Sequence, residues 1–321
     1  MIDCENLVKA IDAYIQKADD SLEDALEAAG YADPSGAVSE AARLEERVAE
    51  ALKEETDYIL GQTDEALDLE AFATEVWPGV QLNDDLAEKL YLVFLEEFTA
   101  YMPDLVSDYL ALTEPDLIVE QITKRTTDWI DSWSAELADL MKLTSHTEID
   151  AILKKGLEEG QSVQEFTQAI MDSGIRDEYY RARRVSITEV LRAHSYAREE
   201  ALIQSPAVEE KEWVHTGAYR NSPRPGHVAL SGTVIPKNER FELQGADGNT
   251  YYPLFPRDSS LPAGESVNCH CIHRGIVSKQ VLGLPLEERR ALQAQAIADD
   301  DGAWEAELDA KNKAKAGIEE N

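Results

Sequence analysis

The sequence predicts a mainly α-helical fold, in which a helical N-terminal region is followed by a small α+β domain and a C-terminal helix with a tail. Apolar residues recur at three- and four-residue spacing through residues 1–205, which is the pattern of amphipathic helices. At Pro206 the pattern changes, because short β-branched and aromatic runs alternate with Gly and Pro. Residues 206–280 contain 7 of the 17 glycines and 7 of the 12 prolines, so short strands joined by turns are expected there.

These patterns divide the chain into four segments. They are a helical N-terminal region (1–145), a second helical segment (146–205), the α+β domain (206–280) and a C-terminal helix with an acidic tail (281–321). The length of 321 residues and a composition of 43% hydrophobic and 29% charged residues are typical of a globular protein with a substantial core.

Gly, Pro and capping residues set the expected ends of the N-terminal helices. The helices expected are residues 7–29 ending at Gly30, residues 37–60 after Asp33-Pro34, a helix from an Asn83 cap to Tyr101 that ends at Met102-Pro103, and residues 115–143. The motif Trp77-Pro78-Gly79 is expected to break the helical pattern.

Two capping boxes follow, in which a Ser hydroxyl and a Glu carboxylate three residues later satisfy the first free amides of a helix. Ser145 with Glu148 predicts a helix over 149–157, and Ser162 with Glu165 predicts one over 166–171. Gly160 is expected to form the turn between them. A long helix is then expected over 177–204.

The α+β domain is expected to contain short strands. They are placed at 211–215, 233–235, 241–243, 251–252 and 267–277, with a turn at 245–249. A helix is expected from Pro285 to about residue 298. The polar tail from Asp299 onward is expected to fray or to wrap onto a partner.

The formal net charge of −34 limits the possible partners. It argues against broad binding to nucleic acid or to an anionic membrane, because such binding depends on Lys and Arg replacing counterions. The segment 206–280 holds eight acidic and eight basic residues, so the whole excess of negative charge lies outside it. No stretch is apolar enough to span a bilayer and no secretory signal is evident, so folding in the cytosol is expected.

Cysteine and histidine gather in the α+β domain, where the sequence Cys269-His270-Cys271 is followed by His273. On one strand, residues 269, 271 and 273 would share a face. Three interpretations stay open. The two cysteines are small buried side chains, or they form a disulfide, or they bind a structural zinc ion together with His227 and either His273 or His215. Apart from this possible zinc, no cofactor is expected.

Three blocks of sequence, in a fixed order, resemble the phage Mu F-like minor head protein family, also called phage head morphogenesis proteins. The blocks are Gly160-Gln-Ser162 leading to Arg183-Arg-Val-Ser-Ile-Thr188-Glu189, then Trp213 through Arg220 with His227, Leu230-Ser-Gly232 and Phe241, and then Pro262-Ala-Gly-Glu-Ser-Val-Asn-Cys269-His-Cys271. The resemblance covers about residues 150–280 and makes 146–205 the helical part of the family's domain. His270 stands where the family usually has Arg.

The resemblance implies a low-copy virion protein, a minor capsid component that acts in head assembly or DNA delivery. Its implied location is the capsid interior near the portal after assembly in the host cytoplasm, and its partners are the portal protein and other head proteins, with nucleic acid contacted only indirectly and no membrane. In the matched blocks, Trp213, Arg220 and Gly232 are expected to be structural or interface residues. For Glu189, which lies in an apolar stretch, two interpretations stay open: a buried polar link between the long helix and the α+β domain, with an Arg or backbone partner, or an exposed surface charge.

No enzymatic activity is expected. His215, His227 and Arg220 could form an acid–base pair with an anion-binding side chain, as in a nuclease-like effector. The sequence offers no nucleophile with a base, no paired carboxylates at fixed spacing and no phosphate-binding glycine loop to complete such a site. A second alternative is an acidic protein that mimics DNA when it binds a basic partner.

Overall fold

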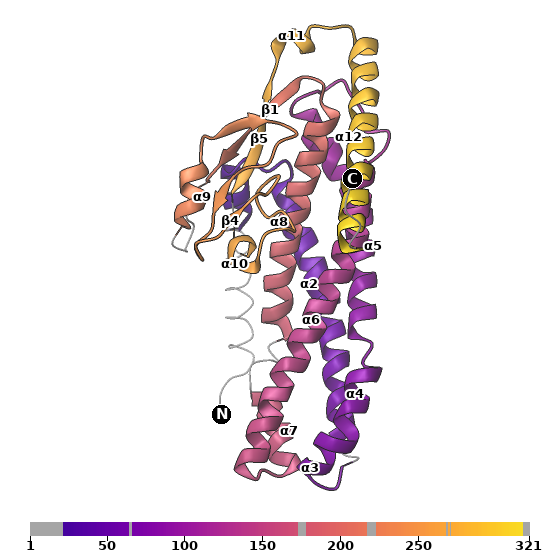
Figure 1. Cartoon of the computed structure of the whole chain (residues 1–321), viewed down its shortest axis with the longest axis vertical. Helices are drawn as coiled ribbons and strands as arrows, with labels where there is room; N and C mark the ends of the chain where they lie inside the picture. Colours follow the sequence, from indigo (N-terminus) through magenta and orange to yellow (C-terminus); the bar gives the residue numbers. More distant parts are fainter. Residues whose placement is uncertain are drawn as a thin grey trace. The chain divides into compact units, whose positions relative to one another are not determined.

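The computed structural model of the chain describes residues 22–63, 66–172, 178–216, 223–267, 269 and 271–316. Within these ranges the protein is mainly helical with small antiparallel sheets, and a long helix follows the α+β part (Figure 1). The predicted fold class is confirmed. None of the helices in the described ranges has both the length and the apolar character that crossing a bilayer requires.

Five long helices account for most of the described residues. They are α2 (Pro34–Thr63), α5 (Leu86–Ala111), α6 (Lys124–Glu159), α8 (Glu178–Gln204) and α12 (Leu286–Lys315). The shorter elements are α3 (Leu69–Ala71), the π-helical turn η1 (Phe72–Val76), α4 (Trp77–Asn83), α7 (Val163–Asp172), α9 (Pro225–Leu230), α10 (Ala263–Ser266) and α11 (Lys279–Leu282). The strands are β1 (Val208–Val214), β2 (Val234–Pro236), β3 (Leu243–Gln244), β4 (Thr250–Tyr251) and β5 (Ile272–Val277).

The chain forms two compact units that are each assembled from separate stretches of sequence. Unit 1 comprises Met1–Glu40, Ala100–Asp128 and Thr188–Asn321, and unit 2 comprises Ala41–Thr99 and Trp129–Ile187. The boundaries between the units fall inside α2, α5, α6 and α8.

Unit 2 has an apolar core in which aromatic side chains from α4, α7 and η1 meet. Its buried members are Ile59, Leu69, Phe72, Trp77, Val80, Ile149, Leu153, Phe166 and Ile170. The ring centroid of Phe72 lies 5.3 Å from that of Phe166 and 6.1 Å from that of Trp77. The indole N–H of Trp77 donates a hydrogen bond of 2.6 Å to Asp150 on α6. Burial of this cluster is the main stabilising term expected for the unit.

Unit 1 contains a three-stranded antiparallel sheet with the order β2-β1-β5, beside a two-stranded hairpin formed by β3 and β4. In the register of β1 with β5, Trp213 is paired with His273. Gly275 of β5 has no room for a side chain, because an added Cβ would lie 2.7 Å from Leu202 on α8. Figure 1 shows α9 and α10 next to these strands.

The part of α8 that belongs to unit 1 is buried on its polar as well as its apolar side. The imidazole of His194 lies between two Tyr hydroxyls, with Nδ1 2.9 Å from Tyr109 Oη and Nε2 3.0 Å from Tyr101 Oη. Burial lowers the pKa of His194 well below its ordinary value. On the next turn, Glu199 accepts a 2.6 Å hydrogen bond from the buried ammonium of Lys211 on β1. Buried polar pairs of this kind are satisfied by one another instead of by water.

The helix α12 contacts the segment that joins α5 and α6 and also the beginning of α6. Arg289 pairs with Glu114, Gln293 donates to the carbonyl oxygen of Ile118, and Trp304 donates to Asp128. The prediction of a fraying tail from Asp299 is therefore wrong for the described residues, because α12 continues to Lys315.

Several predicted helix ends differ from the structure. The motif Trp77-Pro78-Gly79 does not break the chain, since Pro78 lies in the first turn of α4, where no backbone N–H is needed. The side chain of Asp84, not of Asn83, caps α5 by accepting from Leu86 N at 2.9 Å. α5 then continues through Pro103 to Ala111, because the residues that follow the proline are buried.

The helix predicted at 115–143 begins only at Lys124, and it is continuous with the helix predicted at 149–157. Ser145 is not a cap, because its hydroxyl donates to Glu55 of α2 within the helical run. The second capping box is confirmed: Ser162 N donates to Glu165 (2.8 Å) and Glu165 N donates to Ser162 Oγ (3.2 Å).

The remaining predicted elements fall close to observed ones. Gly30 and Gly160 have φ values of +79° and +68°, which suits their predicted roles at helix ends. The long helix at 177–204 and the strands at 211–215, 233–235 and 251–252 are confirmed within a few residues. The helix expected at 7–29 lies largely outside the described residues, although residues 22–28 are helical.

Candidate metal centre

Three separate segments of unit 1 bring two thiols and two imidazoles together. His227 is on α9, Cys269 and Cys271 precede β5, and His215 follows β1. His227 Nδ1 lies 3.5 Å from Cys269 Sγ and 3.7 Å from Cys271 Sγ. His215 Nδ1 lies 3.4 Å from Cys271 Sγ. The ligand atoms of His227 and the two cysteines all lie within 4.8 Å of one another, and all three residues are buried.

The position of His227 depends on close packing of α9 against the β3–β4 hairpin. Pro225 occupies the first turn of α9, where its fixed φ favours a helix start. At Gly226 an added Cβ would lie 2.0 Å from the carbonyl oxygen of Gln244, so only glycine allows this approach. The next residue, His227, is thereby directed into the cluster.

The second ring nitrogen of His227 is held by a buried carboxylate. His227 Nε2 lies 2.9 Å from Glu265 Oε2, and Glu265 Oε1 accepts a 2.8 Å hydrogen bond from Ala246 N. Glu265 is on α10 and is 3% exposed. It therefore connects α9, the hairpin turn and α10. With a proton on Nε2, the lone pair of Nδ1 faces the sulfur atoms.

The backbone around the two cysteines is fixed by the buried guanidinium of Arg257. Its five hydrogen bonds go to the carbonyl oxygens of Leu191, Cys269 and Cys271 and to the hydroxyls of Tyr31 and Ser195. A guanidinium has five N–H donors, so its donor capacity is fully used. Arg257 itself has a φ of +68°, a left-handed conformation that is uncommon for residues other than glycine.

The thiols lie in an apolar, aromatic surrounding. Cys269 and Cys271 are each 3% exposed and pack with Trp213 and Phe241. The ring centroid of Trp213 lies 5.6 Å from that of His227 in an edge-on arrangement. A hydrogen bond between the two thiols lowers the pKa of Cys269 well below its ordinary value and raises the pKa of Cys271.

The structure separates His273 from the cluster. His273 is in β5, stacks on Phe255 and lies 3.1 Å from Glu199, and burial lowers its pKa to about 4. The expectation that residues 269, 271 and 273 share one strand face is wrong, because β5 begins only at Ile272 and strand alternation does not extend back to the cysteines. His215, the other option, takes the place beside Cys271.

The other predicted structural residues have these positions. Glu189 is buried and pairs with Arg192 at 2.9 Å, while Arg192 also donates to the carbonyl oxygen of Arg257. Trp213 is fully buried in β1. Gly232 has a φ of +87° and donates to the carbonyl oxygen of Trp213. Arg220 and His270 lie outside the described residues.

Sequence reasoning missed the roles of Glu265 and Arg257. Glu265 lies inside the third family-like block, yet nothing in its spacing indicates a partner 38 residues earlier in the chain. The pair Pro256-Arg257 carries no signal of burial, because Arg is usually exposed.

A second group of possible ligands lies in unit 2, where Glu55, Asp84 and His146 converge. His146 Nε2 is 2.6 Å from Asp84 Oδ2, and the other oxygen of Asp84 caps α5. Asp84 therefore acts as a helix cap, and His146 is the partner that holds its carboxylate in place. The group therefore has a structural explanation without a metal ion.

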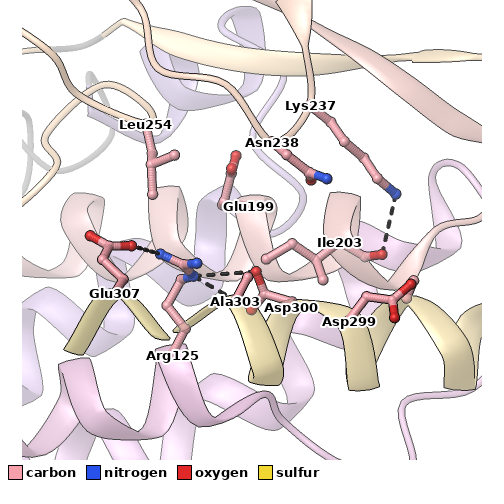
Figure 2. A pocket seen from close by; sticks show the side chains of 11 residues that line it. Arg125, Glu199, Ile203, Lys237, Asn238, Leu254, Asp299, Asp300, Ala303 and Glu307 are labelled. Atoms are coloured by element: carbon pink, nitrogen blue, oxygen red, sulfur yellow. Dashed lines mark hydrogen bonds and ion pairs between the residues drawn. The ribbon is translucent and has the colours of Figure 1, made fainter. Parts of the chain in front are cut away.

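A cavity of about 430 Å³ in unit 1 is lined by charged residues of α6, α8 and α12. Figure 2 shows Arg125 between Asp300 and Glu307, at 3.3 Å and 3.2 Å. Lys237 donates to the carbonyl oxygens of Leu202, Ile203 and Ser205 at the C-terminal end of α8. Burial lowers the pKa of Lys237. These charges satisfy one another and the free carbonyls of a helix end, which is a structural role.

Comparison with known proteins supports the resemblance seen in the sequence. Residues 147–274 match the family described as phage Mu protein F like protein, and this range includes α7, α8 and the Cys/His cluster. The chain is 36% identical over 220 residues to the uncharacterized protein YqbB of Bacillus subtilis (strain 168), an alignment that covers 68% of this chain and 70% of that protein. No solved structure matches the chain. The chain belongs to the family of phage Mu F-like head morphogenesis proteins.

Proposed function

We propose that the chain is a low-copy minor component of a phage head, located inside the capsid near the portal, where it acts in head assembly or DNA delivery. The observation that carries the proposal is the family match over residues 147–274. This range contains α8, whose residues 188–204 are buried, and most of the α+β part. The partners proposed are the portal protein and other head proteins.

The charge of the chain supports this location. A net charge of −34 argues against broad adhesion to the phosphates of packaged DNA, which suits a protein packed beside DNA. The same charge favours partners with basic surfaces, and contacts between exposed charges weaken as ionic strength rises. Binding to the proposed partners should therefore be weaker in high salt.

The geometry of the cluster argues against His227 as a general acid or base. His227 is 2% exposed, and its two ring nitrogens face the thiols and Glu265. A general acid or base must reach a substrate proton directly or through one water. His227 has no ring nitrogen directed to solvent with which to do so.

The test uses the phage or prophage that encodes the chain. Heads and proheads are isolated from a strain with an in-frame deletion, from the same strain complemented with the wild-type chain, and from a strain that lacks the portal protein. We expect the complemented chain to sediment with heads, to resist protease added outside, and to be absent from heads made without portal protein. Its copy number relative to the major capsid protein is measured by quantitative mass spectrometry.

Two outcomes would contradict the proposal. A chain that stays in the soluble fraction while normal heads form is not a head component. A purified chain that cleaves DNA or RNA, and loses this activity in His227→Ala, is a nuclease-like effector. Salt-sensitive competition with DNA for a basic protein, without incorporation into heads, would instead favour the DNA-mimic alternative.

A further inference from the structure

We propose that Cys269, Cys271, His227 and His215 bind one zinc ion, which links α9, the end of β1 and the segment before β5 in unit 1. Thiolates and imidazoles are the donors that zinc prefers in structural sites, where four protein ligands form a tetrahedron. The four residues come from three segments of sequence, so a metal ion would connect parts of the fold that share little apolar core.

The distances within the cluster match the edges of a zinc tetrahedron. With Zn–S bonds of about 2.3 Å and Zn–N bonds of about 2.0–2.1 Å, tetrahedral angles place a sulfur and a nitrogen ligand about 3.6 Å apart. The three observed S···N distances are 3.5, 3.7 and 3.4 Å. These distances are compatible with hydrogen bonds that involve sulfur, and they equally suit two atoms bound to the same ion.

The surroundings of the ligands have the features of a metal site. Zinc-binding imidazoles usually donate their other N–H to a carboxylate, which fixes the ring orientation. Glu265 does this for His227, from a buried position and at 2.9 Å. Arg257 holds the carbonyl oxygens of both cysteines, and its buried positive charge favours thiolates over thiols. Binding releases the thiol protons and leaves two thiolates that neutralise the ion.

His215 is the fourth ligand in this proposal. It follows the last residue of β1, its backbone N–H is held by Ser231 Oγ at 3.0 Å, and its side chain is half-buried. His215 lies outside the group of three whose ligand atoms all fall within 4.8 Å of one another. A rotation of its side chain toward His227 would close the site, which would then have no open position for a substrate.

The role inferred for the ion is structural. The apolar cluster around it contains only Trp213, Phe241 and the two cysteines among its fully buried members in the described residues. Small domains with a thin core are often stabilised by a metal ion, and the free energy of binding then contributes to folding. This inference does not depend on the proposed role in the phage head, because it concerns only the α+β part of the chain.

The test begins with the full chain purified without a metal-affinity tag, stripped with a chelator and titrated with Zn²⁺. We expect one zinc per chain by elemental mass spectrometry, and a dissociation constant measured by competition with a chromophoric chelator. In Cys269→Ser and Cys271→Ser, stoichiometric binding should be lost. His146→Gln is the matched control and should still bind one zinc, because His146 belongs to a different group of residues in unit 2.

Two milder variants address the possibility that the cysteine variants do not fold. Glu265→Gln should weaken zinc affinity about 10- to 100-fold, the effect typical of a lost outer carboxylate. His215→Ala should weaken affinity at least as much without removing the other three ligands. In addition, Co²⁺ bound to the unaltered chain should show thiolate-to-metal charge-transfer absorption and the intense visible bands of a tetrahedral ion.

The proposal is overturned by any of four results. The unaltered chain binds no zinc, or its Co²⁺ complex lacks a thiolate band, or its intact mass shows a Cys269–Cys271 disulfide after purification without oxidant. Zinc that is lost in His146→Gln but kept in Cys269→Ser would place the metal in unit 2 and also refute it.

Discussion

The substitution Arg257→Lys removes the guanidinium that anchors the backbone of the Cys/His cluster to α8. Arg257 donates five hydrogen bonds to buried acceptors, whereas a lysine ammonium has three donors. At least two acceptors must lose their partner, and each unsatisfied buried group costs about 1–3 kcal/mol. The expected loss in the free energy of unfolding is therefore about 2–6 kcal/mol.

The assay is urea unfolding at pH 7, followed by tryptophan fluorescence and far-ultraviolet circular dichroism. The matched control is Arg274→Lys, because Arg274 is an arginine in the adjacent strand whose side chain is 63% exposed and pairs with Glu212. An exposed pair of this kind contributes only about 0–1 kcal/mol. Equal unfolding free energies for the two variants would refute the argument that the five buried contacts of Arg257 hold the segment before β5.

Three further predictions follow. Burial lowers the pKa of His194 in the folded protein, whereas the unfolded chain takes up a proton at this residue near pH 6.5. The contribution of His194 to stability is therefore complete above about pH 6.5 and is lost as the pH falls below it. Between pH 7.5 and pH 5, the melting temperature should fall less steeply in His194→Gln than in the unaltered chain. Lys211→Met leaves the carboxylate of Glu199 buried without its ammonium partner and should lower the free energy of unfolding in urea by about 3–5 kcal/mol. The double variant Lys211→Met/Glu199→Gln should recover part of this loss. Gly226→Ala should lower the melting temperature because its Cβ would meet a backbone carbonyl oxygen, whereas Gly79→Ala, with open space around it, should leave it unchanged or raise it.

Periodicity predicted most of the helices, because a long apolar stripe needs a partner surface whatever the details of its ends. It failed where tertiary contacts overrode local signals. Pro103 carries a strong helix-ending signal, but the buried residues beyond it keep α5 helical. Ser145 has the spacing of a capping box, yet its hydroxyl is used by Glu55, which is 90 residues away in sequence.

The candidate site was predicted in part. The sequence grouped Cys269, Cys271 and His227, and the structure brings these three residues together. His273 was included because a strand was expected to begin before the cysteines, whereas β5 begins after them. The contacts of Glu265 and Arg257 join segments that are 38 and 66 residues apart, and no local pattern records such pairs.

Apart from the possible burial of Glu189, the buried polar face of α8 was also beyond sequence reasoning. Glu200 accepts hydrogen bonds from Thr123 and Thr126 at the start of α6, and Gln204 donates to the same carboxylate. A helix with this many polar residues normally exposes one side. Here that side is covered because each polar group has a partner from another segment, which only the tertiary structure reveals.

The most direct test of the central claim, that two thiols and two imidazoles from three segments meet at one metal ion, is X-ray absorption spectroscopy at the zinc edge of the reconstituted full chain. The predicted result is two sulfur ligands at about 2.3 Å and two nitrogen ligands at about 2.0–2.1 Å. A first shell made of nitrogen and oxygen alone would contradict it, since Cys269 and Cys271 could not then be the ligands.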